Sequence, residues 1–318
     1  MADVSSLQQI RPEPIEDIAE EDIPSFSPVV SISGSGVLPL SPSSSLYSIL
    51  RVLIKVQKYS AYTFTSFVGI HLTSVVVVPL VPLVSADIKQ EVFEMARAVY
   101  MSIPQFENIV ILGSSIIHVA SGVAIRIIRS ILRHNREREK VQHRKSHVTT
   151  ELITDDTRDD IGLGGITNLL GLGYTKSLVS QYLGMSPLSV AGYCLIPLIS
   201  WHYAKFRYVP LSIDGDSSLV NLNYISYYLN ISPQGTLGQF VNFWALASLL
   251  WVGTYHMVNG LMKLNHKFSK NWKRAGWTIV NSTAILGYVA LVSYKRQSVE
   301  TSGFIGRTFV KYLQSLYL

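Results

Sequence analysis

Long apolar stretches alternate with short polar ones along the sequence. Residues 59–86 contain no Asp, Glu, Lys or Arg, which exceeds the roughly 20 residues that a helix needs to cross a bilayer. Further apolar runs cover residues 108–129, 187–206, 240–262 and 275–294. This pattern predicts an all-α integral membrane protein whose core is a bundle of five transmembrane helices.

The polar segments divide the chain around these runs. The first 46 residues are acidic and then rich in Ser, Pro and Gly, which predicts a disordered tail. Residues 47–58 pair apolar and basic positions at helical spacing, so they are expected to lie on the membrane surface. The predicted organisation is a tail (1–46), an amphipathic helix with spans one and two (47–132), a basic and Gly-rich cytosolic loop (133–185), spans three to five (186–296) and a C-terminal amphipathic helix (297–318).

The C-terminal helix has the same two-sided pattern. Ile305, Phe309, Leu313 and Leu316 recur at helical spacing with Arg307 and Lys311 between them. Such a helix is typical of a segment that lies on a membrane surface.

Composition and charge narrow the function classes. Hydrophobic residues make up 48% of the chain, and the net charge is +6. The basic residues cluster beside apolar runs without interleaved aromatic residues, so we expect membrane lipids and not nucleic acid as partners. Cys194 is the single cysteine, which excludes a disulfide framework within the chain and a Cys-type zinc site.

Lys and Arg predict the orientation. The three basic clusters, within residues 51–58, 126–145 and 263–274, all fall on the side of the N-terminal tail if the chain crosses the membrane five times. Because cytosolic loops carry an excess of Lys and Arg, the N-terminus is predicted to be cytosolic.

Four histidines lie within the apolar runs and form an internal repeat. The motif His118-x-x-Ser121-Gly122 returns as His256-x-x-Asn259-Gly260. His71 and His202 each stand eight residues before a proline, Pro79 and Pro210. The chain is therefore predicted to contain two related helix pairs and one extra helix.

The histidines also fall into two pairs by depth. His118 and His256 lie about 10–12 Å from the basic residues at the cytosolic face, while His71 and His202 lie nearer the far side. Two neutral imidazoles facing each other across a bundle can bind a b-type haem, and Gly122 and Gly260, one turn further on, would leave room for the macrocycle.

The sequence therefore predicts one or two haem b groups and no other metal, since the spans hold no carboxylate to complete a site. In the alternative reading, the histidines hydrogen-bond neighbouring helices and the small residues permit close helix packing.

The histidine-bearing helices resemble the membrane-anchor cytochrome b subunits of succinate dehydrogenase and fumarate reductase. The resemblance implies that His118 and His256 share the haem nearer the cytosol and that His71 and His202 share a second. That family also binds a dehydrogenase and has a Ser and Arg quinone-site pattern near the first histidine. Neither feature is evident in this sequence.

The tail contains a second candidate site, Ile10, Pro12, Pro14 and Ile15. Two prolines one residue apart favour an extended backbone, which suits a peptide that adds to the edge of another protein's sheet. The alternative is a simple proline-containing linker.

The whole chain resembles the fungal family of mitochondrial outer-membrane adapter proteins, which combine an acidic Pro-x-Pro tail with histidine-bearing spans. The resemblance implies that Ile10, Pro12, Pro14 and Ile15 bind a bridge-like lipid-transfer protein of the vacuolar protein sorting family. Recruitment at contacts of mitochondria with vacuoles or endosomes would then support lipid homeostasis and mitochondrial morphology.

Two alternative functions remain open at this point. One is a cytochrome b-like redox or haem protein. The other is a phospholipid scramblase, in which polar intramembrane residues such as Ser114, Ser115 and Asn259 line a lipid path. The sequence contains no hydrolytic triad, nucleotide loop or carboxylate pair, so we assign no catalytic residues and do not expect an ordinary enzyme.

Overall fold

A computed structural model describes residues 42–82, 84–143, 163, 185–299 and 301–315. Within these ranges the chain forms helices and no strand, which confirms the all-α prediction. The tail with Ile10, Pro12, Pro14 and Ile15, and nearly all of the loop between spans two and three, lie outside the described residues.

The first half of the described chain contains two long helices joined by shorter elements. Its elements are α1 (Pro42–Leu72), η2 (Thr73–Val77), α2 (Val78–Leu80), α3 (Ala86–Met101), η3 (Glu107–Gly113) and α4 (Ser114–His143), where η marks a π-helical turn. The second half contains α7 (Pro187–Tyr203), η5 (Ala204–Tyr208), α8 (Val209–Asp214), α9 (Leu222–Asn230), α10 (Gly235–Leu264), α11 (Lys270–Arg296) and α12 (Gly303–Gln314).

Among the described residues, 4 helices are long and apolar enough to cross a membrane: Ser45–Leu80, Glu107–Asn135, Gly235–Leu264 and Lys270–Arg296. They correspond to the predicted spans one, two, four and five. The predicted third span is a helix, but α7 has only 17 residues, and its continuation carries Lys205 and Arg207. Five spans and a cytosolic N-terminus therefore stay predictions.

The first span differs from the prediction at both ends. Residues 47–58 are not a separate surface helix, because α1 continues through them without a break. The helix also ends at Leu80 and not near residue 86. Val81 is extended, with ψ of 117°, as expected for a residue that precedes a proline.

The local backbone has the same distortion at the two His–Pro segments. The π-helical turn η2 begins two residues after His71 and ends two before Pro79, and η5 has the same spacing from His202 and Pro210. Proline lacks an N–H and its ring crowds the carbonyl four residues earlier. A π-helical turn accommodates this change within a continuous helix. The two prolines thus produce the same distortion in each half.

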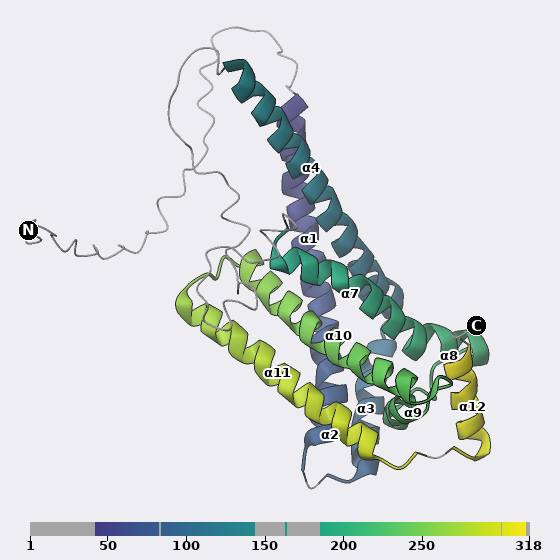
Figure 1. The fold of residues 1–318 in the computed structure, drawn as a ribbon. Coiled ribbons are helices and arrows are strands. Elements are labelled where there is room, and N and C mark those ends of the chain that lie inside the picture. The colour runs from purple at the N-terminus through teal and green to yellow at the C-terminus, as the bar shows by residue number, and fades with distance from the viewer. Residues whose placement is uncertain (1–41, 83, 144–162, 164–184, 300, 316–318) are drawn as a thin grey trace, which may run out of the picture.

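The long helices of each half of the chain pack against one another. α1 packs along α4, α7 packs along α10, and α11 packs on the other side of α10. Figure 1 shows the first part of α1 and the last part of α4 running together beyond the remaining helices. The four histidine-bearing helices thereby form two neighbouring pairs.

Two helices that the apolar runs did not predict, α3 and α9, form part of the structure. The side chain of Ser85 caps α3 by accepting a hydrogen bond from the Ile88 N–H, and Asn221 caps α9 by accepting from the Tyr224 N–H. Such capping residues are common at helix starts. On α9, Tyr224, Tyr227, Tyr228 and Leu229 are buried and form the centre of the largest hydrophobic cluster.

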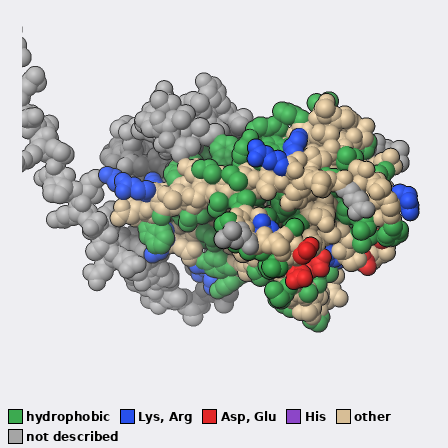
Figure 2. Space-filling model, turned by 90° about the horizontal axis from the view of Figure 1, so that it is seen from below, with side chains coloured by type: hydrophobic (Ala, Val, Ile, Leu, Met, Phe, Trp, Pro, Cys, Tyr) green, Lys and Arg blue, Asp and Glu red, His purple; other side chains and the backbone are tan. Residues whose placement is uncertain are grey.

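The C-terminal segment forms helix α12, and part of its apolar face packs against the protein. Phe309 and Leu313 of α12 are buried in the α9 cluster, where the Phe309 ring lies 5.0 Å from that of Tyr224. Ile305 remains exposed, and Leu316 lies outside the described residues. Figure 2 shows the end of the molecule that lies lowest in Figure 1, where charged side chains form separate groups among hydrophobic ones.

The packing of α12 can be tested with two substitutions on the same helix. Phe309→Ala should lower the free energy of unfolding by about 3–5 kcal/mol, because the ring is buried and its loss leaves a cavity. Ile305→Ala is the matched control and should have a much smaller effect, since its side chain is 45% exposed. Thermal unfolding in detergent measures both. Equal loss of stability would contradict the described position of α12.

Candidate functional site: two histidine pairs

The structure brings the four histidines of α1, α4, α7 and α10 together in the pairs expected from the sequence. The ring centroids of His118 on α4 and His256 on α10 are 6.1 Å apart, with an interplanar angle of 89°. Those of His71 on α1 and His202 on α7 are 5.9 Å apart, with an angle of 67°. Each pair joins equivalent positions of the two repeats.

The two pairs lie at different levels of the bundle. His118 Nδ1 is 3.3 Å from the carbonyl oxygen of Gln57 on α1, and Gln57 precedes His71 on the same helix by 14 residues. At the rise of an α-helix this separation is about 21 Å. The levels predicted from the spacing of the basic residues are therefore distinct in the structure.

The first pair is held by a hydrogen bond at each imidazole. His256 Nδ1 lies 3.1 Å from the carbonyl oxygen of Leu188 on α7, the counterpart of the contact between His118 and Gln57. Leu188 precedes His202 by 14 residues, just as Gln57 precedes His71. A carbonyl only accepts, so each Nδ1 carries the proton and donates, which leaves the Nε2 lone pair of each ring for another partner.

Glycines near the first pair serve different purposes. A Cβ atom at Gly192 on α7 would be 2.9 Å from His256 Cε1, so only glycine lets α7 approach this imidazole. A Cβ atom at Gly122 would lie 3.0 Å from Gln57 Nε2. At Gly260 no atom would lie within 4 Å. Gly122 thus permits a close approach of α1, whereas Gly260 borders open space.

The second pair has an aromatic environment. The Phe67 ring stacks on His71 at 5.4 Å, and the Phe206 ring lies 4.9 Å from His202. His202 Nδ1 is buried and has no hydrogen-bond partner among the described residues. A buried nitrogen without a hydrogen-bond partner costs free energy of folding. The second pair therefore makes fewer of its possible hydrogen bonds than His118 and His256 do.

The ring separations fit a single metal ion between two imidazoles. First-row metal ions bind imidazole nitrogen at about 2.0–2.1 Å, and the nitrogen lies about 1 Å from the ring centre, so opposite axial ligands have centroids about 6 Å apart. Within the described residues no group of three or more His, Cys, Asp or Glu side chains could hold a metal ion. The centroid separations of 6.1 and 5.9 Å are thus compatible with two-histidine ligation of one metal ion.

The polar residues beside the histidines form hydrogen bonds with other groups of the protein. The hydroxyls of Ser115 and Ser121 donate to carbonyls of their own helix, at 2.5 and 3.0 Å, and Ser114 does the same. Asn259 accepts from the Leu163 N–H at 3.1 Å. These hydrogen bonds lie within the protein, and the lipid path lined by Ser114, Ser115 and Asn259 stays a prediction.

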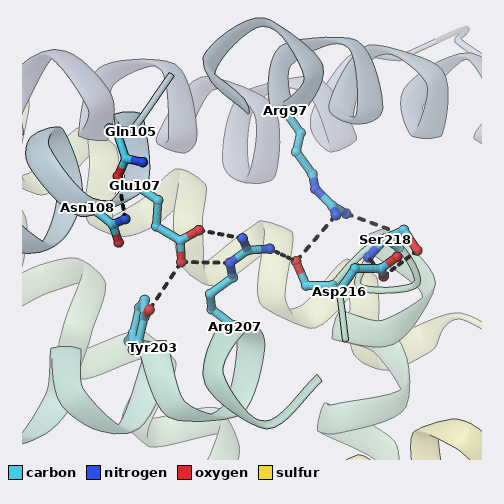
Figure 3. A network of polar contacts seen from close by, with 9 residues as sticks. Arg97, Gln105, Glu107, Asn108, Tyr203, Arg207, Asp216 and Ser218 are labelled. Atoms are coloured by element: carbon cyan, nitrogen blue, oxygen red, sulfur yellow. Dashed lines mark hydrogen bonds and ion pairs between the residues drawn. The ribbon is translucent and has the colours of Figure 1, made fainter. Parts of the chain in front are cut away.

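A network of charged side chains at the end of the bundle near α3 was not foreseen (Figure 3). Glu107 of η3 forms an ion pair with Arg207 of η5 and accepts a hydrogen bond from Tyr203 at 3.1 Å. Arg97 of α3 donates to the carbonyl of Ser218 at 3.2 Å. The sequence feature that indicates this ion pair is the position of its two charges: Glu107 lies just before one apolar run, and Arg207 lies just after another.

This charged network links the two repeats and does not form an open site. Arg97 and Arg207 both donate to the hydroxyl of Ser217. Hydrogen bonds from the backbone and side chain of Ser218 hold the pKa of the Asp216 carboxyl below its usual range. Because these groups are bonded to one another, we interpret the network as a structural connection.

The fold and the paired histidines define a multi-pass helical membrane protein built from two histidine-bearing repeats. The sequence model of the family described as MDM10-complementing protein 1, transmembrane domain, matches residues 66–179 and 197–309, and the chain therefore belongs to this family. The two matched stretches begin five residues before His71 and five before His202, which agrees with the repeat.

One curated relative covers nearly the whole chain. Mitochondrial adapter protein MCP1 of Saccharomyces cerevisiae is 26% identical in an alignment of 301 residues that covers 92% of this chain and 91% of that protein. No solved structure matches the chain. Neither the family nor this relative is a cytochrome b subunit, so the comparisons do not support that resemblance.

Proposed function

We propose that this chain is a mitochondrial adapter protein anchored by its helical bundle. The similarity to a mitochondrial adapter over about nine-tenths of both chains carries this proposal. Four span-length helices among the described residues provide the membrane anchor. The outer membrane is the proposed location, with the tail facing the cytosol as the basic clusters predict.

The proposed docking element is the tail motif of Ile10, Pro12, Pro14 and Ile15. Its prolines favour an extended strand-like conformation, and the flanking isoleucines can fill pockets along a sheet edge. The partner proposed from the family resemblance is a bridge-like lipid-transfer protein of the vacuolar protein sorting family. Its recruitment to contacts with the vacuole or endosome would supply lipid to mitochondria.

The docking motif is tested by changing its prolines in the full-length protein. Pro12→Ala with Pro14→Ala should abolish recruitment of the lipid-transfer protein to mitochondria, because the peptide loses its fixed extended backbone. Pro24→Ala with Pro28→Ala in the same tail is the matched control and should leave recruitment intact. Fluorescence microscopy of the tagged partner measures both, and mitochondrial fractionation verifies membrane insertion. Recruitment that survives loss of Pro12 and Pro14 would refute this docking mode.

The histidine pairs favour a second, compatible function, the binding of haem b. The observation that supports it is the geometry of His118 and His256, whose centroid separation fits one metal ion and whose Nδ1 atoms contact backbone carbonyls. Those carbonyls orient the rings and increase the basicity of the free nitrogens. His71 and His202 would hold a second haem. Bound haem would supply one-electron chemistry at its iron.

Haem binding is tested by the visible spectrum of the detergent-purified protein, oxidised and then reduced. We expect a six-coordinate b-type spectrum whose contribution from the first pair is lost in both His118→Ala and His256→Ala. His266→Ala is the control, because this histidine lies in the turn after α10 and outside the pairs. A protein that remains colourless after haem is supplied would contradict the proposal and leave the histidines as packing residues.

A further inference from the structure

Arg126 of α4 has an unsatisfied guanidinium nitrogen. Its Nη1 atom is buried and has no hydrogen-bond partner among the described residues. The residue as a whole is half-buried, but a buried donor atom without an acceptor has lost its hydration without compensation. The guanidinium instead lies over the Tyr193 ring of α7, at 5.4 Å from the ring centroid. Nη1 can therefore donate to an anionic group that the described part of the chain does not provide.

The contacts of α7 place this guanidinium beside the His118–His256 pair. Tyr193, which holds the guanidinium, directly follows Gly192, whose backbone lies against the His256 ring. Arg126 follows His118 by eight residues on α4. Side chains on a helix lean toward its N-terminus, so the Arg126 side chain leans back toward the level of His118. The cation therefore borders the space next to the paired imidazoles.

The internal repeat shows that this arginine is not required by the helix packing. With His118 aligned to His256, the position equivalent to Arg126 is Leu264. Its partner Tyr193 has an equivalent in Tyr62, which donates instead to the Asn265 side chain at 2.7 Å. Lys58 lies over the Tyr62 ring, at 5.7 Å from the ring centroid, so a cation accompanies the aromatic residue in both halves. The two cations differ in origin, because Lys58 precedes Tyr62 on the same helix whereas Arg126 reaches Tyr193 from α4.

We propose that Arg126 binds a propionate carboxylate of the haem held by His118 and His256. This inference rests on the proposed haem binding. Haem b carries its two carboxylates at one edge of the macrocycle, and a guanidinium forms short, paired hydrogen bonds to a carboxylate. Arg126 is a positioning residue: it fixes which edge of the haem faces α4, and it does not ligate the iron.

The test combines a change in the protein with a change in the ligand. The full-length protein in detergent is titrated with haem and with haem dimethyl ester, whose carboxylates are blocked. Arg126→Gln should weaken haem binding by about 10- to 100-fold, the usual value of a charged hydrogen bond. The ester should bind the unmodified protein more weakly by a similar factor. Because both changes remove the same contact, the ester should bind Arg126→Gln no more weakly than haem does.

Two further variants distinguish a failure of the Arg126 inference from a failure of haem binding itself. Arg129→Gln, at an exposed position on the next turn of α4, is the matched control and should bind haem like the unmodified protein. Arg126→Gln should keep the six-coordinate spectrum of the first pair, which His118→Ala removes. Equal binding of haem and ester by the unmodified protein would overturn the inference and leave a lipid phosphate as the anion. A protein that binds neither would overturn the haem proposal itself, and this inference with it.

Discussion

The structure depends on one constraint, which is that polar groups inside a membrane must find partners within the protein. Four imidazoles are placed among apolar helices, one on each member of the two helix pairs. His118 and His256 satisfy one nitrogen each by donating to Gln57 and Leu188 on the partner helix of their own repeat. Their rings lie next to each other across the two repeats, with centroids 6.1 Å apart. The contact between the repeats thus contains two imidazoles, each with one nitrogen left for a further partner.

The repeat gives this arrangement its pseudo-symmetry. In each half a histidine, a π-helical turn and a proline follow at the same spacing, and the carbonyl that orients the other histidine lies 14 residues earlier. The two halves differ in their charged residues. One contributes Glu107 and the other Arg207 to an ion pair at the far end, and only the first has an arginine, Arg126, beside the imidazoles. Equivalent backbones therefore carry different charges.

The sequence predicted the features that recur along one helix and missed those that depend on contacts between segments. The apolar runs predicted five spans, of which four are span-length helices in the described part of the chain. The His–Pro and His–Gly spacings predicted the pairing of the histidines. Helices α3 and α9 were missed because their segments are short and contain many polar residues, although Ser85 and Asn221 are ordinary caps. The amphipathic pattern of α12 could not distinguish a membrane surface from the buried tyrosines of α9, since both accept an apolar face.

The central claim is that equivalent histidines of the two repeats face each other, and cysteine cross-linking in mitochondrial membranes tests it most directly. In a Cys194→Ser background, His118→Cys is combined with His256→Cys, and His71→Cys with His202→Cys. The chain is treated with a short bifunctional thiol reagent and then cut at a protease site inserted between residues 144 and 162. We predict that both matched combinations keep the two fragments joined, while the exchanged combinations, 118 with 202 and 71 with 256, let them separate. Efficient cross-linking of the exchanged combinations, with none of the matched ones, would contradict the account.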